Sequence, residues 1–299
     1  MGKRPDGYHE VRTTLQTISL HDDIRFERSE SGAITLSCEK PDIPAGEQNL
    51  IVRAAAALKK RYAVEAGARI DLEKRIPAQA GLGGASSNAA ISLLALAQLW
   101  DIPVRRAELL EIAATLGADV PFFLFGGHAL ATGTGAAISP LADSQSQHLV
   151  VITPNSSVAT ARAYAAVSSS ALTTMNADPI LSSSHEQPNS RGSVPWSPRD
   201  GLNNDFESVI FDIEPEIGRA KEALIRAGAL GALLAGSGSS VFGIFAGQKA
   251  QQLAIDEIES EAGWRIFPCV TLSRNEYLSE MTSRGIHSYA LSTVDDTGA

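Results

Sequence analysis

The chain has 299 residues, a formal net charge of −9, and a composition that is 44% hydrophobic and 20% charged. These values indicate a globular protein and exclude a disordered or fibrous one. A surface that follows nucleic-acid phosphates needs a basic excess, which this acidic sequence lacks, so we expect no nucleic-acid partner. The longest apolar stretch, residues 89–100, is too short to cross a bilayer, so we expect no membrane partner either.

The two cysteines, Cys38 and Cys269, lie far apart in sequence and do not have the spacing of metal ligands. This sparse use of cysteine is typical of the reducing cytoplasm, where we expect the protein to be found. We expect no dedicated metal site formed by the chain itself. The length allows one large domain or two modest ones, and we expect two lobes.

The first part of the chain carries strand and helix patterns in turn. Residues 9–40 contain short alternating runs on either side of Ser29-Glu30-Ser31-Gly32, a pattern that predicts a hairpin-like β region. Apolar spacing predicts the next elements, which are a helix at 49–62, a half-buried strand at 68–73, an apolar helix at about 87–100 and an amphipathic helix at about 106–116. A loop over residues 77–84 joins the strand to the apolar helix.

A second lobe is expected to begin with a buried strand at 148–153. Between residues 168 and 199 the composition shifts to Ser, Pro and Asn, which predicts a loop or insertion. The elements expected after it are a helix at about 214–227, strands at 232–234 and 241–245, a helix at about 249–261 and a strand near 266–272. Helices that alternate with strands, without repeats, indicate an α+β fold. We expect an N-terminal lobe at 1–147 and a C-terminal lobe at 148–299.

The strongest chemical signal is the glycine-rich run from Pro77 to Ala90. Its glycines at 81, 83 and 84 let the backbone turn with amides facing inward, and the predicted helix directs the positive end of its dipole to the same place. Phosphates bind at such helix ends, where the hydroxyls of Ser86 and Ser87 add ligands for a phosphate oxygen or for Mg²⁺. The plainer interpretation is a glycine turn capped by serine. The combination of three glycines, two serines and a following apolar helix favours phosphate binding over that interpretation. The run is neither a Walker A loop nor a dinucleotide fingerprint.

A second candidate is Asp119, which stands between a glycine turn and the apolar run Val120-Pro121-Phe122-Phe123. Rigid apolar neighbours direct a carboxylate and partly desolvate it, which suits a proton acceptor or a metal ligand. The alternative is that Asp119 only caps the turn before Pro121.

A second glycine-serine element covers residues 235–240 and joins two predicted strands. Its plainer interpretation is a hairpin turn. Since the chain has two such loops, an alternative is that one holds phosphates while the other shapes the substrate side.

The order of these motifs resembles that of the GHMP kinases, the superfamily of galactose, homoserine, mevalonate and phosphomevalonate kinases. The resemblance covers nearly the whole chain. The matching motifs are Arg4-Pro5-Asp6-Gly7-Tyr8-His9-Glu10, Asn49-Leu50-Ile51, the run from Gly81 to Ala90, the run from Gly117 to Phe123, Asn204-Asp205-Phe206-Glu207 and Gly236-Ser237-Gly238-Ser239. The first motif resembles the branch that acts on a cytidine-diphosphate-linked methylerythritol.

The resemblance implies a two-lobe fold, with an N-terminal lobe like domain 2 of ribosomal protein S5 and a ferredoxin-like C-terminal lobe. It implies transfer of the ATP γ-phosphate, with Mg²⁺ bound to the nucleotide, to the 2-hydroxyl of 4-diphosphocytidyl-2-C-methyl-D-erythritol, in the non-mevalonate route to isoprenoids. The partner is then this small molecule, and we expect a monomer or weak homodimer.

The resemblance also implies a role for each site residue. The residues implied to hold ATP are Pro77, Gln79, Gly81, Leu82, Gly83, Gly84, Ala85, Ser86 and Ser87. Asp119 is the implied catalytic residue, which takes the proton of the attacking hydroxyl. The implied substrate-binding residues are Tyr8, His9, Asp119, Tyr164, Gly236, Ser237 and Gly238. Stacking on an aromatic ring together with an edge hydrogen bond selects one base, the role expected of Tyr8, His9 and Tyr164.

One departure from the resemblance concerns the start of the chain. The related kinases carry a strand with a Pro-Ala-Lys-Ile-Asn-like run upstream of the Pro-Asp-Gly-Tyr-His-Glu motif, and its lysine supports the catalytic aspartate. The present sequence begins at Met1-Gly2-Lys3 and does not contain that strand. We favour a start codon assigned too late. The alternatives are a trimmed chain, or a weakened or inactive relative. For the function, the alternatives are another small-molecule kinase of the superfamily, or a catalytically impaired nucleotide-binding relative.

Overall fold

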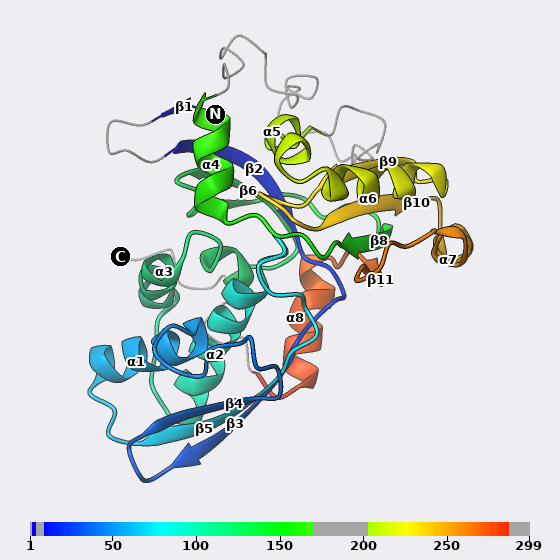
Figure 1. Cartoon of the computed structure of the whole chain (residues 1–299). Helices are drawn as coiled ribbons and strands as arrows, with labels where there is room; N and C mark the ends of the chain where they lie inside the picture. The colour runs from blue at the N-terminus through cyan, green and yellow to red at the C-terminus, as the bar shows by residue number, and fades with distance from the viewer. Residues whose placement is uncertain (1, 4–8, 170–202, 287–299) are drawn as a thin grey trace, which may run out of the picture. The chain divides into compact units, whose positions relative to one another are not determined.

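The computed structural model describes residues 2–3, 9–169 and 203–286, and these form two compact units (Figure 1). Unit 1 takes its residues from Met1–Arg12, Gln79–Leu82 and Ala142–Thr271, and unit 2 takes its residues from Thr13–Ala78, Gly83–Leu141 and Leu272–Ala299. The chain therefore passes between the units several times, whereas the sequence analysis places one boundary between residues 147 and 148. That domain boundary stays a prediction. The Ser-rich segment at 168–199 lies outside the described residues from residue 170 on.

Unit 2 contains a three-stranded sheet made of β3 (Asp23–Ser29), β5 (Gly67–Glu73) and β4 (Ile34–Cys38), in that order. The strand β3 is antiparallel to β5, whereas β4 is parallel to it. The predicted hairpin between β3 and β4 is therefore wrong, because β5 lies between them. Parallel neighbours need a crossover connection, and the helix α1 (Leu50–Tyr62) provides the one from β4 to β5.

The helices of unit 2 pack around one apolar core (Figure 1). The helix α1 begins after Asn49, whose side chain accepts a hydrogen bond of 2.9 Å from the amide of Ile51. It packs against α2 (Gly84–Leu99) and α3 (Arg106–Leu116). The buried residues of α2 lie all round the helix, which is typical of a central core helix. These three predicted helices are confirmed, although α2 begins three residues before the predicted start at 87.

The described part of the N-terminal half has five further elements. They are β1 (Gly2–Lys3), β2 (His9–Gln16), the 3-10 helix η1 (Pro121–Leu124), β6 (His128–Gly133) and β7 (Ala137–Pro140). The strands form a sheet in the order β1-β2-β6-β7. The C-terminal helix α8 (Arg274–Ser283) also belongs to unit 2, where Met281 enters the core.

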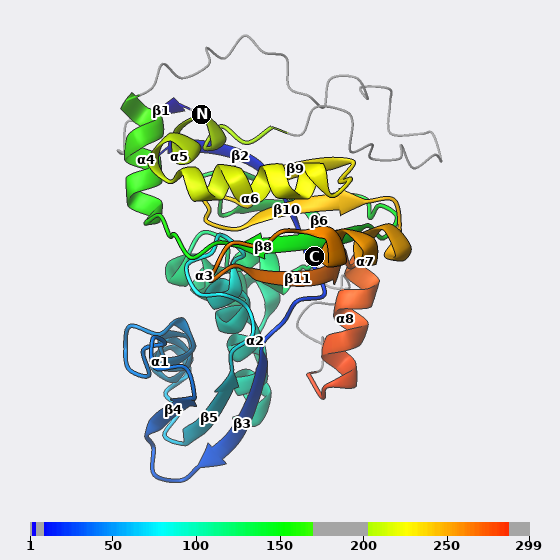
Figure 2. The same ribbon diagram turned by 45° about the vertical axis from the view of Figure 1, so that its right-hand side comes forward.

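The part of unit 1 between Ala142 and Thr271 is an antiparallel sheet with helices packed on it (Figure 2). In chain order its elements are β8 (His148–Thr153), α4 (Thr160–Ser169), α5 (Glu207–Ile213), α6 (Pro215–Arg226), β9 (Gly231–Leu234), β10 (Val241–Phe245), α7 (Gln248–Glu257) and β11 (Arg265–Val270). The sheet order is β11-β8-β10-β9, α6 packs on β10 and β9, and α7 packs on β8 and β11. A β-α-β-β-α-β chain with this order is ferredoxin-like, so the fold expected for the C-terminal lobe is confirmed.

None of the helices in the described part of the chain combines the length and the apolar character that crossing a bilayer requires.

Candidate active site

The second half of the glycine-rich loop forms the start of α2 in unit 2. Gly83 adopts a left-handed conformation, with φ of 68°, and the helix begins at Gly84. The amide of Ser87 already donates to the carbonyl oxygen of Gly83, at 2.9 Å. The amides of Gly84, Ala85 and Ser86 precede the first possible intrahelical bonds, and no side chain of the described residues caps this end of the helix. The arrangement leaves amides and the positive end of the helix dipole available to an anion.

The segment that carries Asp119 lies against this helix end. Asp119 follows the end of α3 at Gly117 and precedes η1. A Cβ atom added to Gly117 would lie 4.0 Å from the Oγ of Ser86, and one added to Gly83 would lie 2.9 Å from the ring of Phe123. These close approaches join residues 117–123 to the first turn of α2. The second half of the predicted phosphate-binding run, at the start of α2, and the segment that carries the predicted catalytic carboxylate therefore lie in the same region of unit 2.

The environment of Asp119 suits proton transfer. Its carboxyl reaches solvent, yet the surrounding protein partly desolvates it, and this desolvation raises its pKa above the ordinary value of an aspartate. The alternative role of Asp119 was to cap the turn before Pro121. Within the described residues no side chain caps η1 itself, and a capping role of Asp119 in the turn before Pro121 stays an open alternative. A carboxylate with a raised pKa is a stronger proton acceptor than an ordinary aspartate.

The glycine-serine loop at 235–240 lies in unit 1, between β9 and β10. It is a hairpin turn, since these strands pair antiparallel and the amide of Ala235 donates to the carbonyl oxygen of Ser240. It also contacts the first half of the other loop, because the Ser240 amide donates to the Ala80 carbonyl oxygen at 3.0 Å. A Cβ atom added to Gly81 would lie 2.1 Å from the Ala235 carbonyl oxygen. The two glycine loops are therefore packed backbone to backbone in unit 1.

Side chains of unit 1 hold the glycine-serine loop in place. The Nδ2 atom of Asn204 donates to the carbonyl oxygens of Leu234 and Gly236, at 2.9 and 2.7 Å. The hydroxyls of Thr153 and Ser240 are hydrogen-bonded at 2.7 Å and buried. The backbone of the loop is thus fixed by the sheet and by the start of α5.

The predicted site residues are divided between the two units. Unit 1 holds Gln79, Gly81, Leu82, Tyr164, Gly236, Ser237 and Gly238, and unit 2 holds Pro77, Gly83, Gly84, Ala85, Ser86, Ser87 and Asp119. Tyr164 lies on α4 and packs edge-on against Phe206, with ring centroids 4.9 Å apart. His9 belongs to β2, whose backbone alone is described at that position, and Tyr8 lies outside the described residues.

The sequence analysis missed the buried polar residues around the loop. Lys74 and Asp22 form an ion pair, with the Nζ atom 2.9 Å from Oδ2 of the carboxylate, and Asn88 bonds to the same carboxylate. Lys74 lies three residues before the loop and Asn88 directly follows its serines, so both positions next to the motif were visible in the sequence. Asp22 lies between two strands, more than fifty positions earlier in the chain, and no pattern in the sequence links it to the loop.

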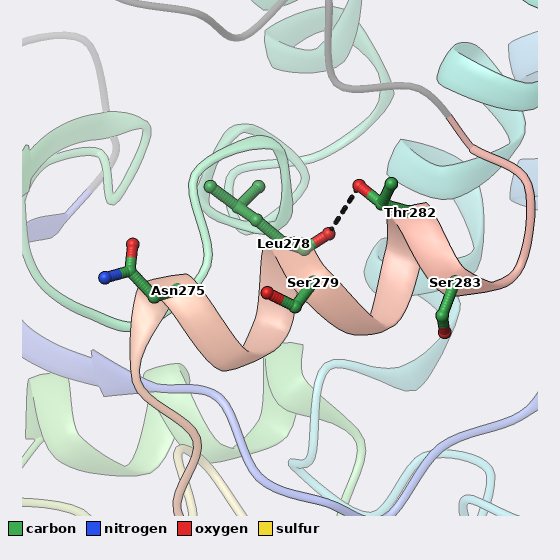
Figure 3. Close-up of a pocket in the computed structure, with 5 residues that line it drawn as sticks. All are labelled: Asn275, Leu278, Ser279, Thr282 and Ser283. Atoms are coloured by element: carbon green, nitrogen blue, oxygen red, sulfur yellow. Dashed lines mark hydrogen bonds between the residues drawn. The ribbon is translucent and has the colours of Figure 1, made fainter.

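A shallow pocket lies on the surface of α8 (Figure 3). Its lining residues are Asn275, Leu278, Ser279, Thr282 and Ser283, all from one face of that helix. The Oγ1 atom of Thr282 donates to the Leu278 carbonyl oxygen at 2.9 Å, within the helix itself. None of the predicted site residues lines this pocket, and a hollow formed by a single helix face does not enclose a ligand.

An α+β protein with a ferredoxin-like unit, a glycine loop at an open helix end and a carboxylate beside it has the features of the GHMP kinases. Models of this family match the chain twice, the GHMP kinases N-terminal domain at residues 49–127 and the GHMP kinases C-terminal domain at residues 197–263.

Individual relatives narrow the class further. The chain is 42% identical to the 4-diphosphocytidyl-2-C-methyl-D-erythritol kinase of Pelotomaculum thermopropionicum, over 85% of this chain and 87% of the relative. It is 39% identical to that of Citrifermentans bemidjiense, over 88% and 91% of the two chains. A crystal structure of 4-(cytidine 5'-diphospho)-2C-methyl-D-erythritol kinase superposes with a TM-score of 0.70 at 34% identity, covering 90% of this chain and 92% of the other. The chain belongs to the 4-diphosphocytidyl-2-C-methyl-D-erythritol kinase family.

A more distant structure shows the extent of the shared fold. The mevalonate kinase of L. major superposes with a TM-score of 0.66 at 17% identity, covering 89% of this chain and 90% of the other. At this identity the similarity concerns the fold alone. The predicted two-lobe GHMP kinase fold is therefore confirmed.

Proposed function

We propose that this chain transfers the γ-phosphate of ATP to the 2-hydroxyl of 4-diphosphocytidyl-2-C-methyl-D-erythritol, a step of isoprenoid biosynthesis. Membership of the family supports the reaction. The observation that carries it is the contact between the turn around Asp119 and the open N-terminus of α2. That contact joins an anion-binding backbone to a proton acceptor, the two parts that phosphoryl transfer to an alcohol requires.

The start of α2 holds the phosphates in this proposal. The amides of Gly84, Ala85 and Ser86 donate to phosphate oxygens, and the helix dipole favours their negative charge. The hydroxyls of Ser86 and Ser87 provide oxygen ligands, which fit Mg²⁺ because this ion binds a few protein oxygens together with substrate phosphates. When bound, Mg²⁺ neutralises the charge that develops on the transferred group.

Asp119 is the general base of the proposed reaction. Its carboxylate accepts the proton of the 2-hydroxyl as the oxygen attacks the γ-phosphorus. Desolvation raises the pKa of the Asp119 carboxyl, and a carboxylate with a raised pKa is a stronger proton acceptor. The neighbouring apolar residues Val120 and Phe122 are buried.

The cytidine end of the substrate is assigned to residues of unit 1 and of the N-terminus. Tyr164 offers an aromatic ring held by Phe206, which suits stacking on a base. The ring of Tyr8 stacks on the base, and His9 or nearby backbone reads its edge. The backbone of Gly236, Ser237 and Gly238 shapes the substrate side. We still predict that the enzyme is cytoplasmic and that it is a monomer or weak homodimer.

The test is an ADP-release assay on the full chain with three separate acceptors: 4-diphosphocytidyl-2-C-methyl-D-erythritol, homoserine and mevalonate. We expect Mg²⁺-dependent turnover with the cytidyl acceptor alone. Turnover confined to homoserine or mevalonate would identify another kinase of the superfamily. ATP binding without turnover of any acceptor would identify a nucleotide-binding relative without this activity.

A further inference from the structure

The buried carboxylate of Asp22 lies in the loop between β2 and β3 and has four polar partners. Its side chain has no exposed surface, and that of its ion-pair partner Lys74 is 8% exposed. The Nζ atom of Lys74 lies 2.9 Å from Oδ2 of Asp22. The backbone amides of Arg75 and Ile76 donate to Oδ1, at 2.7 and 2.8 Å, and the Nδ2 atom of Asn88 donates to Oδ2, at 2.8 Å.

These partners stand at the two ends of the glycine-rich loop. Residues 74–76 lead directly into the loop, and Asn88 lies on α2 just after the serines that end it. One carboxylate therefore bonds the chain where it enters the loop and where it leaves it. The two ends are also in close contact, because a Cβ atom added to Gly84 would lie 2.8 Å from a side-chain carbon of Ile76.

A buried carboxylate is costly unless it is paired and hydrogen-bonded, and here both oxygens are satisfied. Fixing both ends of a loop removes most of the conformations that it would otherwise sample. A loop held in its binding conformation loses less entropy when the ligand binds, so its affinity is higher. Asp22 lies outside the residues assigned to ATP, and its effect on the nucleotide is indirect.

We propose that Asp22, together with Lys74 and Asn88, is a positioning residue that holds the glycine-rich loop in the conformation that binds ATP phosphates. This inference rests on the proposed function. Asp22 acts on the nucleotide through the backbone of residues 75–84 and contacts neither substrate. Its loss therefore weakens ATP binding more than it weakens binding of the alcohol substrate.

The first test compares Asn88→Ala with a matched variant of the same helix, Ser92→Ala. Both changes remove one buried hydrogen bond of α2, since the Ser92 hydroxyl donates to the Asn88 carbonyl oxygen at 2.7 Å, but only Asn88 bonds to Asp22. In Asn88→Ala we expect the KM for ATP and the Kd for a fluorescent ATP analogue to rise about tenfold. The KM for the cytidyl substrate stays within about twofold of wild type. In Ser92→Ala all of these constants stay at wild-type values, although both variants melt at a lower temperature.

The second test uses Asp22→Asn and the double variant Asp22→Asn/Lys74→Met. The single change leaves the Lys74 ammonium buried without its counter-ion, so the double variant separates loss of the positioning bonds from the unpaired charge. We expect both to weaken binding of the ATP analogue at least as much as Asn88→Ala does. Should the Asp22 variants fail to fold, Asn88→Ala alone decides the question.

The outcomes separate the inference from the proposed function. Asn88→Ala with a lower Tm but wild-type KM and Kd for the nucleotide overturns the positioning role and leaves Asp22 as a structural residue. A wild-type chain without turnover of the cytidyl acceptor overturns the proposed function. In that case the Kd of the ATP analogue still tests whether Asp22 positions the loop.

Discussion

The carboxyl of Asp119 is the residue on which the proposed chemistry depends, and replacing it by an amide tests this directly. An asparagine cannot accept the proton of the attacking hydroxyl, so Asp119→Asn should lower kcat by about 10²- to 10⁴-fold while ATP binding is unchanged.

In the wild type, kcat should fall on the acid side as the Asp119 carboxylate is protonated. Because burial raises the pKa of Asp119, this fall should begin at a higher pH than for an ordinary aspartate. Rate profiles against pH provide the measurement.

The raised pKa of Asp119 also affects the stability of the folded state. The folded state favours the protonated form of Asp119 more than the unfolded state does, so its stabilising contribution is present below the unfolded pKa and is lost as the pH rises through the folded pKa. Asp119→Asn should therefore melt at a higher temperature than wild type at pH 7.5, with a gain that shrinks at acid pH. The control is Asp101→Asn, since that carboxyl is 90% exposed and asparagine tolerates its left-handed backbone. Undiminished kcat in Asp119→Asn would remove this residue from the mechanism.

At the scale of elements, the packing of one glycine loop on the other makes Gly81 irreplaceable. Its φ is +75°, a conformation that costs other residues about 1–2 kcal/mol. An added Cβ would also lie 2.1 Å from the carbonyl oxygen of Ala235 and 2.8 Å from that of Gly238, and these backbone atoms cannot turn aside. Gly81→Ala should lower the Tm and raise the KM for ATP about tenfold or more, since each 1.4 kcal/mol of lost binding is a factor of ten.

The matched control for that variant is Gly46→Ala. An added Cβ at Gly46 meets no atom within 4 Å, so this change should leave both Tm and KM at wild-type values. If Gly81→Ala behaved like Gly46→Ala, the close packing of residues 79–82 on the glycine-serine loop would not exist in solution.

Local patterns predicted most of the helices and strands but not all of their partners. The alternation of Ala68, Ile70 and Leu72 with polar residues marked β5 correctly, because one face of a strand is buried and the other is not. The same alternation could not show that β5 lies between β3 and β4, since pairing depends on where the helix α1 returns the chain. The start of α2 was predicted late because glycines 83 and 84 resemble a loop, although Gly84 is the first helical residue.

The sequence likewise predicted only part of the candidate site. Glycine and serine spacing identified the glycine-rich run that leads into α2, because amides and hydroxyls near a helix end are local features. The buried carboxylate of Asp22 was not identified, since its partners at positions 74–76 and 88 are distant in sequence and meet it only in the folded chain. Long-range polar networks of this kind leave no periodic signal.

At the scale of the whole molecule, the chain returns to unit 2 after the ferredoxin-like part of unit 1. The Leu272 amide donates to the Thr17 carbonyl oxygen at 2.9 Å, and the helix α8 that follows packs on the core of unit 2. Ser273 and Glu276 form a capping box that begins this helix. The sequence analysis did not predict α8, and it assigned residues 272–299 to the C-terminal lobe.

The hydrogen bond between Tyr277 and Phe123 helps to hold α8 on unit 2, and its contribution can be measured. The Tyr277 hydroxyl donates to the Phe123 carbonyl oxygen at 2.8 Å, and burial raises the pKa of this phenol. The ring also lies against Gly126, where an added Cβ would approach it to 2.0 Å. Tyr277→Phe keeps the ring and removes only the donor, so it should lower the free energy of unfolding by about 1 kcal/mol.

That loss should lower the Tm by about 2–4 °C in a thermal melt, given the size of the chain. Tyr62→Phe is the matched control, because its hydroxyl donates to Glu108, a carboxylate that Arg105 also bonds and that water can reach. We expect a smaller change in Tm for that variant. Equal melting of Tyr277→Phe and wild type would mean that the hydroxyl does not help to hold α8 on unit 2, and that apolar packing around Met281 accounts for its attachment.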